Sequence, residues 1–547
     1  MARRLSRKRF LEVAGVGSAL VALSACAPKP TEAPTAAPAA TQPPAATKPP
    51  APTATPVPPT ATPAPAGPKI LRVRLYGDIQ NLDPCFRISQ NDDVVADCVM
   101  EGLVRYGPNS YNLINQLAEE IKASPDGLVI EFKLKEGVKW HKGYGELTTE
   151  DVKFSYERFI DPELKAAYAD DWATLDHVEI IDKYRGKIIL KEPFAPLWKT
   201  TLPVASGSIV CKKYVEEVGI EKFATNIIGT GPYIFAEWMP KQKIVLKRNP
   251  EYHGDPPPWD EIHFIPIEDD KAAEIAAEAG EVDFSRISIA SIPRFENHPN
   301  LKLAKYPSLR YRWIGMNVEH PKLQDIRVRQ AIRYAIDVPA ILQAAYMGQA
   351  EREKTLIPPG LLGHWKDAPV YERDVEKAKA LLAEAGVTSL DLRFDIQDTT
   401  EYRTWAEIAQ QNLKDIGINL TINPMDSSSF WQIGAGEKGK EVELFSGNYS
   451  MQPDPAWATM WFTCEQVGVW NWQRWCEPKF DELHRKGLVT MDDAEREKIY
   501  IEMEKLFDAA CHSVWITHGV YAYVYSPKIQ PAVTPHGVPQ AEFMKPA

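Results

Sequence analysis

The stretch LVIEFKLKEGVKWHKGYGELTTEDVKFSYERF, residues 128–159, contains a strand pattern followed by a helix pattern. Residues 128–134 alternate between apolar and charged side chains, as a strand with one buried face does. Residues 149–159 begin with cap-type residues and place apolar and aromatic side chains among acids and bases, as an amphipathic helix does. A strand and a helix joined by a polar, glycine-containing loop are typical of a chain that mixes both kinds of element.

Strand and helix patterns continue along the chain on both sides of this stretch. Strands are expected at residues 70–76, 187–190, 243–247, 262–267, 311–318, 390–396, 419–422 and 442–445. Helices are expected at 374–385, 405–416 and 492–510, and Gly386 and Gly417 follow the first two as stop signals. Interleaved strands and helices without a short internal repeat predict an α/β fold.

Residues 1–25 predict an export signal. MARRLSRKRF carries five basic side chains, and the apolar run at 13–25 has thirteen residues, whereas a membrane-spanning helix needs about 20. Leu23-Ser24-Ala25-Cys26 resembles the lipobox of bacterial lipoproteins, in which the chain is cut before a diacylglycerol-modified cysteine. Cys26 is therefore the predicted lipid anchor, and the alternative is a signal that is cleaved elsewhere. Residues 6–11 resemble a twin-arginine motif with Lys8 at the second position, which leaves the export route open.

Residues 26–68 predict a disordered tether. Of the 42 positions from 27 to 68, 15 are proline, 13 alanine and 8 threonine, so the segment has too little apolar surface to form a core. Proline-rich chain favours polyproline II, at roughly 3.1 Å per residue, which gives a reach on the order of 100 Å. An acylated cysteine at one end would hold the protein at the membrane.

The charge and length of the chain narrow its partners. The whole chain has a formal charge of −11, and because the signal is basic the remainder is near −15. This charge argues against nucleic acid or an anionic lipid surface as the main partner. Residues 69–547 are long enough for two or three domains and have no stretch of 18 uninterrupted apolar residues, so we expect a soluble folded part.

Six cysteines follow Cys26, and an even number in an exported chain suggests disulfides. Cys464–Cys476 is the first expected pair because both residues flank one Trp-rich loop. Cys85–Cys98 is the second because its spacing is similar, and Cys211–Cys511 would follow by exclusion. The alternative is free buried thiols. No CxxC pair occurs, so no zinc site is predicted, and no other metal site or cofactor is expected.

The stretch at 128–159 resembles the signature region of family 5 solute-binding proteins of ABC importers. Further phrases match that family in its usual order. They are NLDP (81–84), EGLVRY (101–106), GTGPYIFAEW (229–238), LKRNPEYHG (246–254), GEVDF (280–284), GMNVEHPKLQDIRVRQAIRYAID (315–337), EKAKALLAEAG (376–386) and NLKDIGINL (412–420). The resemblance covers nearly all of residues 69–547.

This resemblance implies a two-lobed periplasmic-binding-protein-like fold of type II in its large form, with an extra domain inserted in lobe I. Mapped onto this chain, lobe I is 69–108, 176–305 and 522–547, the extra domain is 109–175, and lobe II (domain III) is 306–521. It implies a monomer that closes on a small-molecule or peptide ligand and delivers it to the permease subunits of an ABC importer. The expected location is the outer face of the cytoplasmic membrane, at the cell surface or in the periplasm.

Candidate ligand-binding residues come from two sources. In VWNWQRWCEPKFD, residues 469–481, the ring of Trp472 and the guanidinium of Arg474 suggest a platform for a planar or sugar-like ligand. The alternative is a disulfide-closed loop packed on its own lobe. The family resemblance implies ligand contacts at Asn448 and Tyr449 after the strand at 442–445. It also implies contacts at Tyr168 and Trp172, where the extra domain meets the cleft in peptide binders.

One departure from the family bears on the ligand. Oligopeptide binders have an acid three residues before an acidic–Pro pair, and here Met451 stands three residues before Asp454-Pro455. A thioether cannot neutralise a peptide's ammonium group, so an oligosaccharide, an opine-like conjugate or a metal chelate is kept beside peptides. Nickel itself is poorly supported because residues 365–483 contain no histidine.

The alternative of another class is a secreted, lipid-anchored hydrolase. No HExxH and no GxSxG motif stands out in the folded part, so no catalytic residue is named and an enzyme is not expected. A third interpretation keeps ligand binding but assigns it to signalling or chaperoning rather than import.

Overall fold

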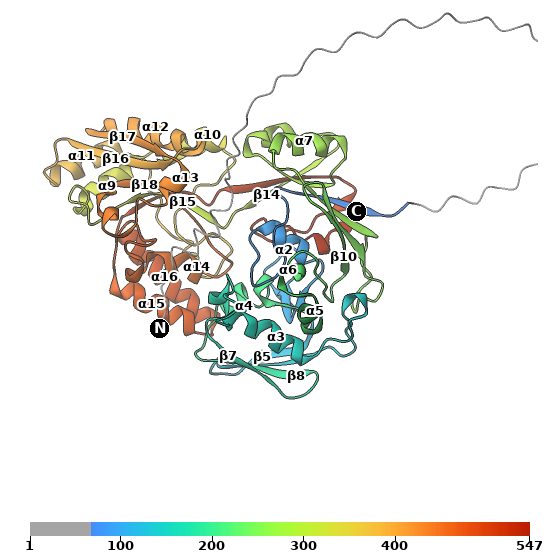
Figure 1. The fold of residues 1–547 in the computed structure, drawn as a ribbon. Helices are drawn as coiled ribbons and strands as arrows, with labels where there is room; N and C mark the ends of the chain where they lie inside the picture. Colours follow the sequence, from blue (N-terminus) through green and yellow to red (C-terminus); the bar gives the residue numbers. More distant parts are fainter. Residues whose placement is uncertain (1–66) are drawn as a thin grey trace, which may run out of the picture.

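The computed structural model describes residues 67–547, which form two lobes joined by long strands (Figure 1). The predicted signal, the anchor Cys26 and nearly all of the predicted tether lie outside the described residues.

The largest sheet has seven strands in the order β10-β11-β12-β1-β13-β20-β14. These are β10 (Tyr233–Met239), β11 (Lys243–Arg248), β12 (Glu261–Pro266), β1 (Ile70–Leu75), β13 (Phe284–Ile287), β20 (Val520–Tyr525) and β14 (Lys302–Pro307). β1 pairs in parallel with β12 and β13, while β20 runs antiparallel between β13 and β14. Because β20 comes from the C-terminal part of the chain, residues more than 400 positions apart build one sheet. The helix α7 (Asp270–Ala279) packs beside β13 on one face.

The second lobe contains a five-stranded sheet in the order β17-β16-β18-β15-β19. These are β17 (Ile418–Met425), β16 (Leu390–Gln397), β18 (Leu444–Ser450), β15 (Arg310–Met316) and β19 (Ser513–Thr517). One face is covered by α9 (Ile326–Ala335), α10 (Val338–Tyr346), α11 (Val375–Glu384) and α12 (Thr400–Lys414). The opposite face packs on α15 (Pro478–Val489), α16 (Asp493–Ala509) and an aromatic cluster. Both faces of the sheet are therefore buried, as is usual where helices cover a mixed sheet.

The stretch at 128–159 forms part of a four-stranded antiparallel sheet with a helix beside it. The strands, in the order β5-β6-β8-β7, are β5 (Ala118–Ala123), β6 (Val129–Leu134), β8 (Arg185–Leu190) and β7 (Leu175–Ile180), and α3 (Thr149–Ile160) packs against β7. The expected end of the extra domain at residue 175 falls at the first residue of β7, inside this sheet. β7 and β8 extend the same hydrogen-bonded ladder from β6, so this unit continues to residue 190.

The lobe that contains the seven-stranded sheet shares one apolar core with the four-stranded sheet. A single buried cluster includes Leu71 of β1, Phe264 of β12 and Ile130 of β6. The remaining elements are short. They are α2 (Gln90–Ala96), β2 (Glu101–Gly102), β3 (Val104–Tyr106), β4 (Leu113–Asn115), α4 (Leu197–Thr200), β9 (Ser208–Ile209), α5 (Lys212–Val218), α6 (Ile220–Phe223), α8 (Ile292–Phe295), α13 (Ser427–Phe430), α14 (Ala456–Thr459), β21 (Ile529–Gln530) and β22 (Lys545–Pro546).

Each lobe contains a buried arginine–carboxylate pair. In the first lobe, Arg158 of α3 donates to both carboxylate oxygens of Asp83, whose side chain is fully buried. In the second lobe, Arg496 of α16 lies 2.9 Å from Asp454, and both side chains are at most 1% exposed. Since a buried charge is costly without a partner, each pair fixes a loop to a helix in one arrangement.

Candidate functional site

Two adjacent crossing segments join the lobes. β14 continues through Ser308 and Leu309 into β15, and β19 continues through His518 and Gly519 into β20. The Ser308 N–H donates to Gly519 O at 3.2 Å, and the Ser308 hydroxyl donates to His518 O. Gly519 has a φ of +77°, and a Cβ there would lie 2.3 Å from Nη1 of Arg312, so the position suits only glycine. Because the lobes are covalently linked at this one narrow place, it is the hinge about which one lobe can move relative to the other.

The lobes also touch at a second place, which we call the interlobe contact. The Ala195 N–H donates to Leu488 O at 2.8 Å, and Nζ of Lys199 lies 3.0 Å from Asp493. In Figure 1, α4, which contains Lys199, lies beside the part of the second lobe formed by α15 and α16. In this structure the lobes therefore meet both at the hinge and at the interlobe contact.

On the first lobe, an arginine and two tyrosines gather next to the hinge. Arg286 of β13 places its guanidinium 4.5 Å from the ring centre of Tyr521 in β20. Tyr76 directly follows β1, and its side chain is 41% exposed. Burial raises the pKa of the Tyr76 hydroxyl, and the charge of Arg286 opposes that rise, which places the two groups near each other. These three side chains, which we call the first-lobe wall, lie where the parallel strands β1 and β13 end. Open α/β sheets bind ligands at this edge.

The expected site residues of the first lobe occupy different environments. Tyr168 is half-buried, and the guanidinium of Arg87 lies 3.9 Å from its ring centre. Trp172 is fully buried, stacks on Tyr156 at 4.3 Å, and donates through Nε1 to Ser206 O at 2.8 Å. The ring and the indole N–H of Trp172 are thus used in the core of this structure, and a contact between Trp172 and ligand stays an untested prediction.

On the second lobe, the end of β18 lies beside β15 at the hinge. Asn448 is half-buried and pairs across the strands with Arg312, whose Nε lies 3.0 Å from Glu401 at the start of α12. Tyr449 is 8% exposed, and its hydroxyl donates to Trp470 O. Asn448 is thus better placed than Tyr449 to offer a polar group outside the core.

The Trp-rich loop packs on its own lobe. Trp472 is 1% exposed and lies among Phe430, Trp431 and Phe445. Arg474 is 7% exposed, pairs with Glu319 and donates to Gly436 O at 3.2 Å. In this structure core packing uses the ring of Trp472 and an internal ion pair uses the guanidinium of Arg474, as in the alternative of a loop packed on its own lobe. The ligand platform stays an untested prediction.

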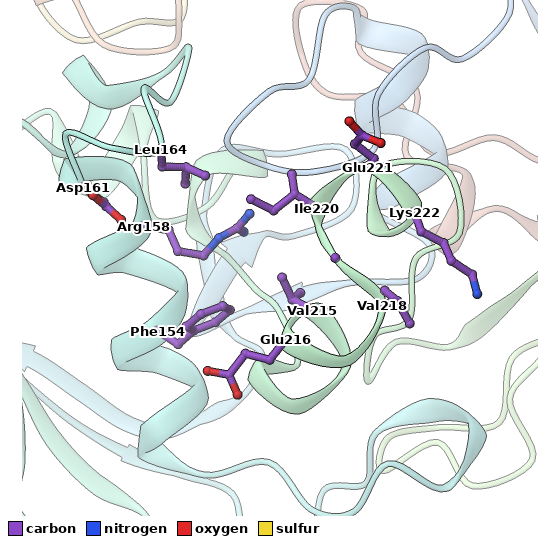
Figure 2. Close-up of a pocket in the computed structure, with 11 residues that line it drawn as sticks. Phe154, Arg158, Asp161, Leu164, Val215, Glu216, Val218, Ile220, Glu221 and Lys222 are labelled. Carbon is purple, nitrogen blue, oxygen red and sulfur yellow. The ribbon is translucent and has the colours of Figure 1, made fainter.

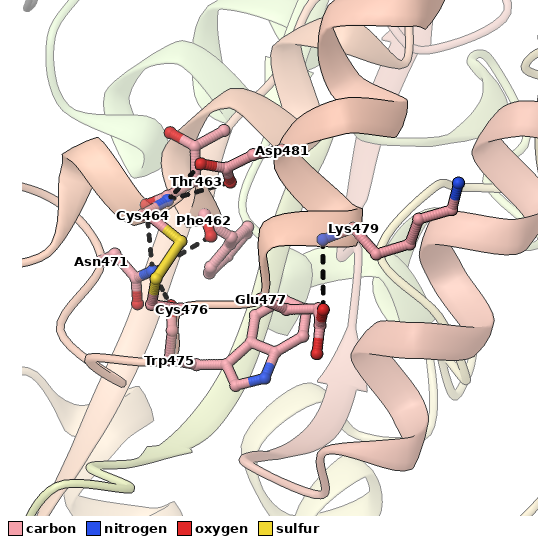
Figure 3. Close-up of a disulfide and its surroundings, with 9 residues drawn as sticks. All are labelled: Phe462, Thr463, Cys464, Asn471, Trp475, Cys476, Glu477, Lys479 and Asp481. Atoms are coloured by element: carbon pink, nitrogen blue, oxygen red, sulfur yellow. Dashed lines mark hydrogen bonds between the residues drawn. A yellow bond between two sulfur atoms is a disulfide. The ribbon is translucent and has the colours of Figure 1, made fainter.

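The loop is closed by the disulfide Cys464–Cys476, with a Cα–Cα distance of 4.5 Å (Figure 3). Inside it, the Asn471 side chain donates to the Phe462, Thr463 and Trp475 carbonyls. The remaining expected pairs are wrong in this structure, since Cys85, Cys98, Cys211 and Cys511 are buried free thiols. The thiol of Cys98, for example, donates to Val94 O within its own helical segment at 3.4 Å, so it is directed away from a partner sulfur.

A hollow of about 650 Å³ lies between α3 and the α5–α6 segment, and no hinge residue lines it (Figure 2). Its walls are apolar, with Phe154, Leu164, Val215 and Ile220, and acids stand among its other lining residues. Arg158 points into it but is already paired with Asp83. The other charged residues that line it, Asp161, Glu216, Glu221 and Lys222, are exposed to solvent, so no buried ionised group without a partner marks this hollow as the main binding site.

The described residues contain neither a candidate metal centre nor a helix that could span a membrane. Across residues 67–547, no group of three or more His, Cys, Asp or Glu side chains could hold a metal ion. Within the same range, no helix is both long enough and apolar enough to cross a bilayer.

Several residues of the hinge region were missed by sequence reasoning. They come from three separate segments of the chain. The strand order brings Arg286 and Tyr521 together beside the hinge, and Glu401 of α12 lies there because it pairs with Arg312. One signal was present in the sequence, because Arg310 and Arg312 alternate with apolar residues at the start of an otherwise buried strand. Charged residues at alternate positions of such a strand indicate an end that is not enclosed in the core.

A buried carboxyl group lies against the hinge. Glu353 is 8% exposed, its Oε2 lies 3.2 Å from Nε2 of His518, and it accepts the Lys354 N–H at 2.8 Å. Burial raises the pKa of Glu353 to about 7, and burial lowers the pKa of His518 to about 3. Burial raises the pKa of a second buried acid, Glu504, and the nearby Glu353 adds to that rise. Both partners are therefore mainly uncharged at mildly acidic pH.

Replacing Glu353 with glutamine is expected to raise the free energy of unfolding, relative to wild type, more at pH 7 than at pH 5. The unfolded carboxyl releases its proton near pH 4.5 and the folded one near pH 7, so wild-type stability falls as pH rises through this window. Glutamine cannot titrate, so the difference in the free energy of unfolding should grow by roughly 2 kcal/mol from pH 5 to pH 7. Urea unfolding of both proteins at the two pH values measures it. An equal difference at both values would contradict the prediction.

The architecture is that of a protein in which two lobes can close about a hinge, and the comparisons with known proteins assign it to a family. The model of the bacterial extracellular solute-binding proteins, family 5 Middle, matches residues 112–469. The match covers more than half of the chain, so the chain belongs to this family, whose members bind solutes rather than transform them.

Individual relatives agree with this assignment. The dipeptide-binding protein of Escherichia coli (strain K12) is 28% identical over 443 residues, which are 76% of this chain and 83% of the relative. Di/tripeptide-binding protein 4 of Pseudomonas aeruginosa (strain UCBPP-PA14) is 30% identical over 443 residues, 76% of this chain and 83% of the relative. The structure of HbpA2 from Haemophilus parasuis superposes with a TM-score of 0.81 at 25% identity and covers 87% of this chain and all of that one. The expected two-lobed α/β fold is thus confirmed.

Proposed function

We propose that this chain is an exported binding protein that captures a peptide or peptide-like solute between its lobes and delivers it to an ABC import permease. The hinge carries the proposal, because two single crossing segments link two separately cored lobes. Such a link lets the lobes separate and close without unfolding either core. The names of the relatives, which are dipeptide- and di/tripeptide-binding proteins, support a peptide ligand.

The candidate site residues that keep some exposure suit a polar ligand of modest size. Tyr76 and Tyr168 offer partly exposed rings, Arg286 offers a guanidinium, and Asn448 offers an amide. Met451 is 6% exposed and packs in the aromatic cluster, so no carboxylate at that position meets a ligand's ammonium group. The ligand's positive end, where it has one, is held by another group.

An opine-like conjugate is a second candidate ligand. A binding protein from A. tumefacien R10, named AgaA and solved with agropinic acid, superposes with a TM-score of 0.65 at 25% identity over 84% of this chain. A conjugate of this kind offers carboxyl and hydroxyl groups without requiring an acid at Met451.

The remaining parts of the proposal concern location and assembly. The lipobox at residues 23–26 supports a lipid anchor on Cys26, and the proline-rich segment to residue 68 supports a tether to the outer face of the membrane. A tether keeps the binding protein near its permease and raises its effective concentration there. We infer a monomer, since one chain supplies both lobes and the hinge.

The full chain, extracted from bacterial membranes, is expected to be stabilised by a subset of peptides and to leave them unchanged. A thermal-shift screen of di- and tripeptides, opines, oligosaccharides and metal chelates identifies the ligand class, and chromatography of the recovered ligand detects turnover. Small-angle scattering should show compaction with the best ligand. Stabilisation by sugars or chelates alone would contradict the peptide assignment, and conversion of the ligand would contradict the binding-protein assignment. An intact mass that shows no lipid on Cys26 would contradict the proposed lipid anchor.

A further inference from the structure

Arg286 differs from the other arginines of residues 67–547 in its surroundings. Within this range, the arginines without a carboxylate inside 4.0 Å are Arg286, Arg310, Arg329 and Arg485. Arg329 donates to backbone carbonyls instead, with Leu323 O at 2.6 Å, and Arg310 and Arg485 are exposed to solvent. Arg286 is half-buried, and its side chain makes no hydrogen bond to any described residue. Burial without a counter-charge costs free energy, so the position is unfavourable in the empty protein.

The stacking of Arg286 leaves its hydrogen-bond donors available. Its guanidinium lies 4.5 Å from the ring centre of Tyr521, so one flat face is covered by an aromatic ring. The five N–H donors of a guanidinium point outward in its plane, and stacking on the face does not use them. The strand is fixed in place, since Nη1 of Arg74 donates to the carbonyl of Arg286 at 2.7 Å. A held guanidinium with free edges is pre-organised for a planar anion.

The position of Arg286 connects it with the hinge. Tyr521, which covers its face, lies two residues after Gly519 in the crossing strand β20. Tyr76, at the end of β1, is the partly exposed ring close to Arg286. A group bound at the edge of Arg286 would therefore touch the first-lobe wall at the point where movement of the second lobe begins.

We propose that Arg286 determines specificity by binding a carboxylate group of the ligand. The ligand is a peptide-like solute that binds with this carboxylate directed toward β13. The inference rests on the function proposed above and adds a chemical requirement to it. A carboxylate can accept two parallel N–H bonds from a guanidinium edge, and such charge-assisted pairs are among the stronger hydrogen bonds in proteins. The carboxylate can come from the C-terminus of a peptide or from an acidic side chain.

Matched peptides distinguish these two sources. The probes are Ala-Ala-Ala with a free or an amidated C-terminus, and Ala-Glu-Ala compared with Ala-Gln-Ala, titrated calorimetrically into the full-length chain. Wild type is expected to bind the carboxylate-bearing member of at least one pair ten times more tightly or better. Arg286→Gln should reduce that preference to less than threefold, and Arg286→Lys, which keeps the charge but not the planar fork, should retain part of it. Arg485→Gln, which removes an exposed arginine of α15, is the matched control and should keep the wild-type preference.

Each outcome decides the inference. Loss of the preference in Arg286→Gln with retained affinity for the neutral member supports it, and the pair that loses its preference identifies the source of the carboxylate. An unchanged preference in Arg286→Gln, or no preference in wild type, overturns it while leaving peptide binding in place. If none of the four peptides binds wild type although other peptides do, the carboxylate requirement fails in this form. If no peptide of the thermal-shift screen binds, both the inference and the peptide assignment fail.

Discussion

Replacing Asp454 with alanine is expected to lower the free energy of unfolding by about 3–5 kcal/mol. Asp454 follows β18 and lies 2.9 Å from Arg496 of α16, and both side chains are at most 1% exposed. Removing the carboxylate leaves a guanidinium that water cannot reach, so most of the loss comes from the uncompensated charge rather than from the missing bond. Urea unfolding followed by circular dichroism measures the change.

Asp493 provides the matched control for this prediction. It lies 3.7 Å from the same Arg496, but its side chain is 60% exposed. Because solvent screens an exposed pair, Asp493→Ala should cost less than about 1 kcal/mol. The double variant Asp454→Ala, Arg496→Met should recover part of the loss, since no buried charge then remains. Equal losses in Asp454→Ala and Asp493→Ala would show that burial does not govern this pair.

Replacing Asp83 with alanine is expected to cost a similar amount, about 3–5 kcal/mol, in the first lobe. Both carboxylate oxygens of Asp83 accept from Arg158, and Oδ1 also accepts the Cys85 N–H at 3.0 Å. The pair connects the loop after β1 to α3, so its loss should loosen the four-stranded unit from the seven-stranded sheet. Urea unfolding measures the total loss, and hydrogen exchange at α3 should rise before global unfolding.

Asp161 is the control in this lobe. It is exposed, directly follows α3, and accepts only the backbone N–H of Glu163, at 2.9 Å. Asp161→Ala should therefore change stability by less than about 1 kcal/mol. If Asp83→Ala unfolds at the same urea concentration as Asp161→Ala, the ion pair does not hold the loop to the helix.

Much of the fold follows from local patterns of the sequence. The stretch at 128–159 predicted β6 and α3 nearly to the residue, because alternation and a capping sequence act over short distances. Thr399 shows the limit of the pattern at helix ends. Its side chain accepts the Tyr402 N–H at 3.3 Å, so α12 begins at Thr400 rather than at the expected residue 405, because its polar first turn has no apolar signal.

The candidate site was harder to predict because its contacts join distant segments. Arg474 looked available in the sequence, but its partner Glu319 is 155 residues away. Trp172 looked like a cleft residue, but Tyr156 and Ser206 enclose it. Arg286 showed no local signal at all, because Tyr521 reaches it through the order of strands in the sheet. A side chain's availability to a ligand depends on these tertiary contacts, and residue type alone does not reveal it.

The place of β20 between β13 and β14 sets the order in which the lobes can be completed. The second lobe is made from one uninterrupted piece of chain between the two crossing segments, so its sheet can form as soon as β19 has been synthesised. The seven-stranded sheet, in contrast, lacks an inner strand until residue 525 is present. Long-range strand pairing of this kind is slow. The seven-stranded sheet, although most of its strands emerge early, is therefore the last of the three large sheets that can be completed.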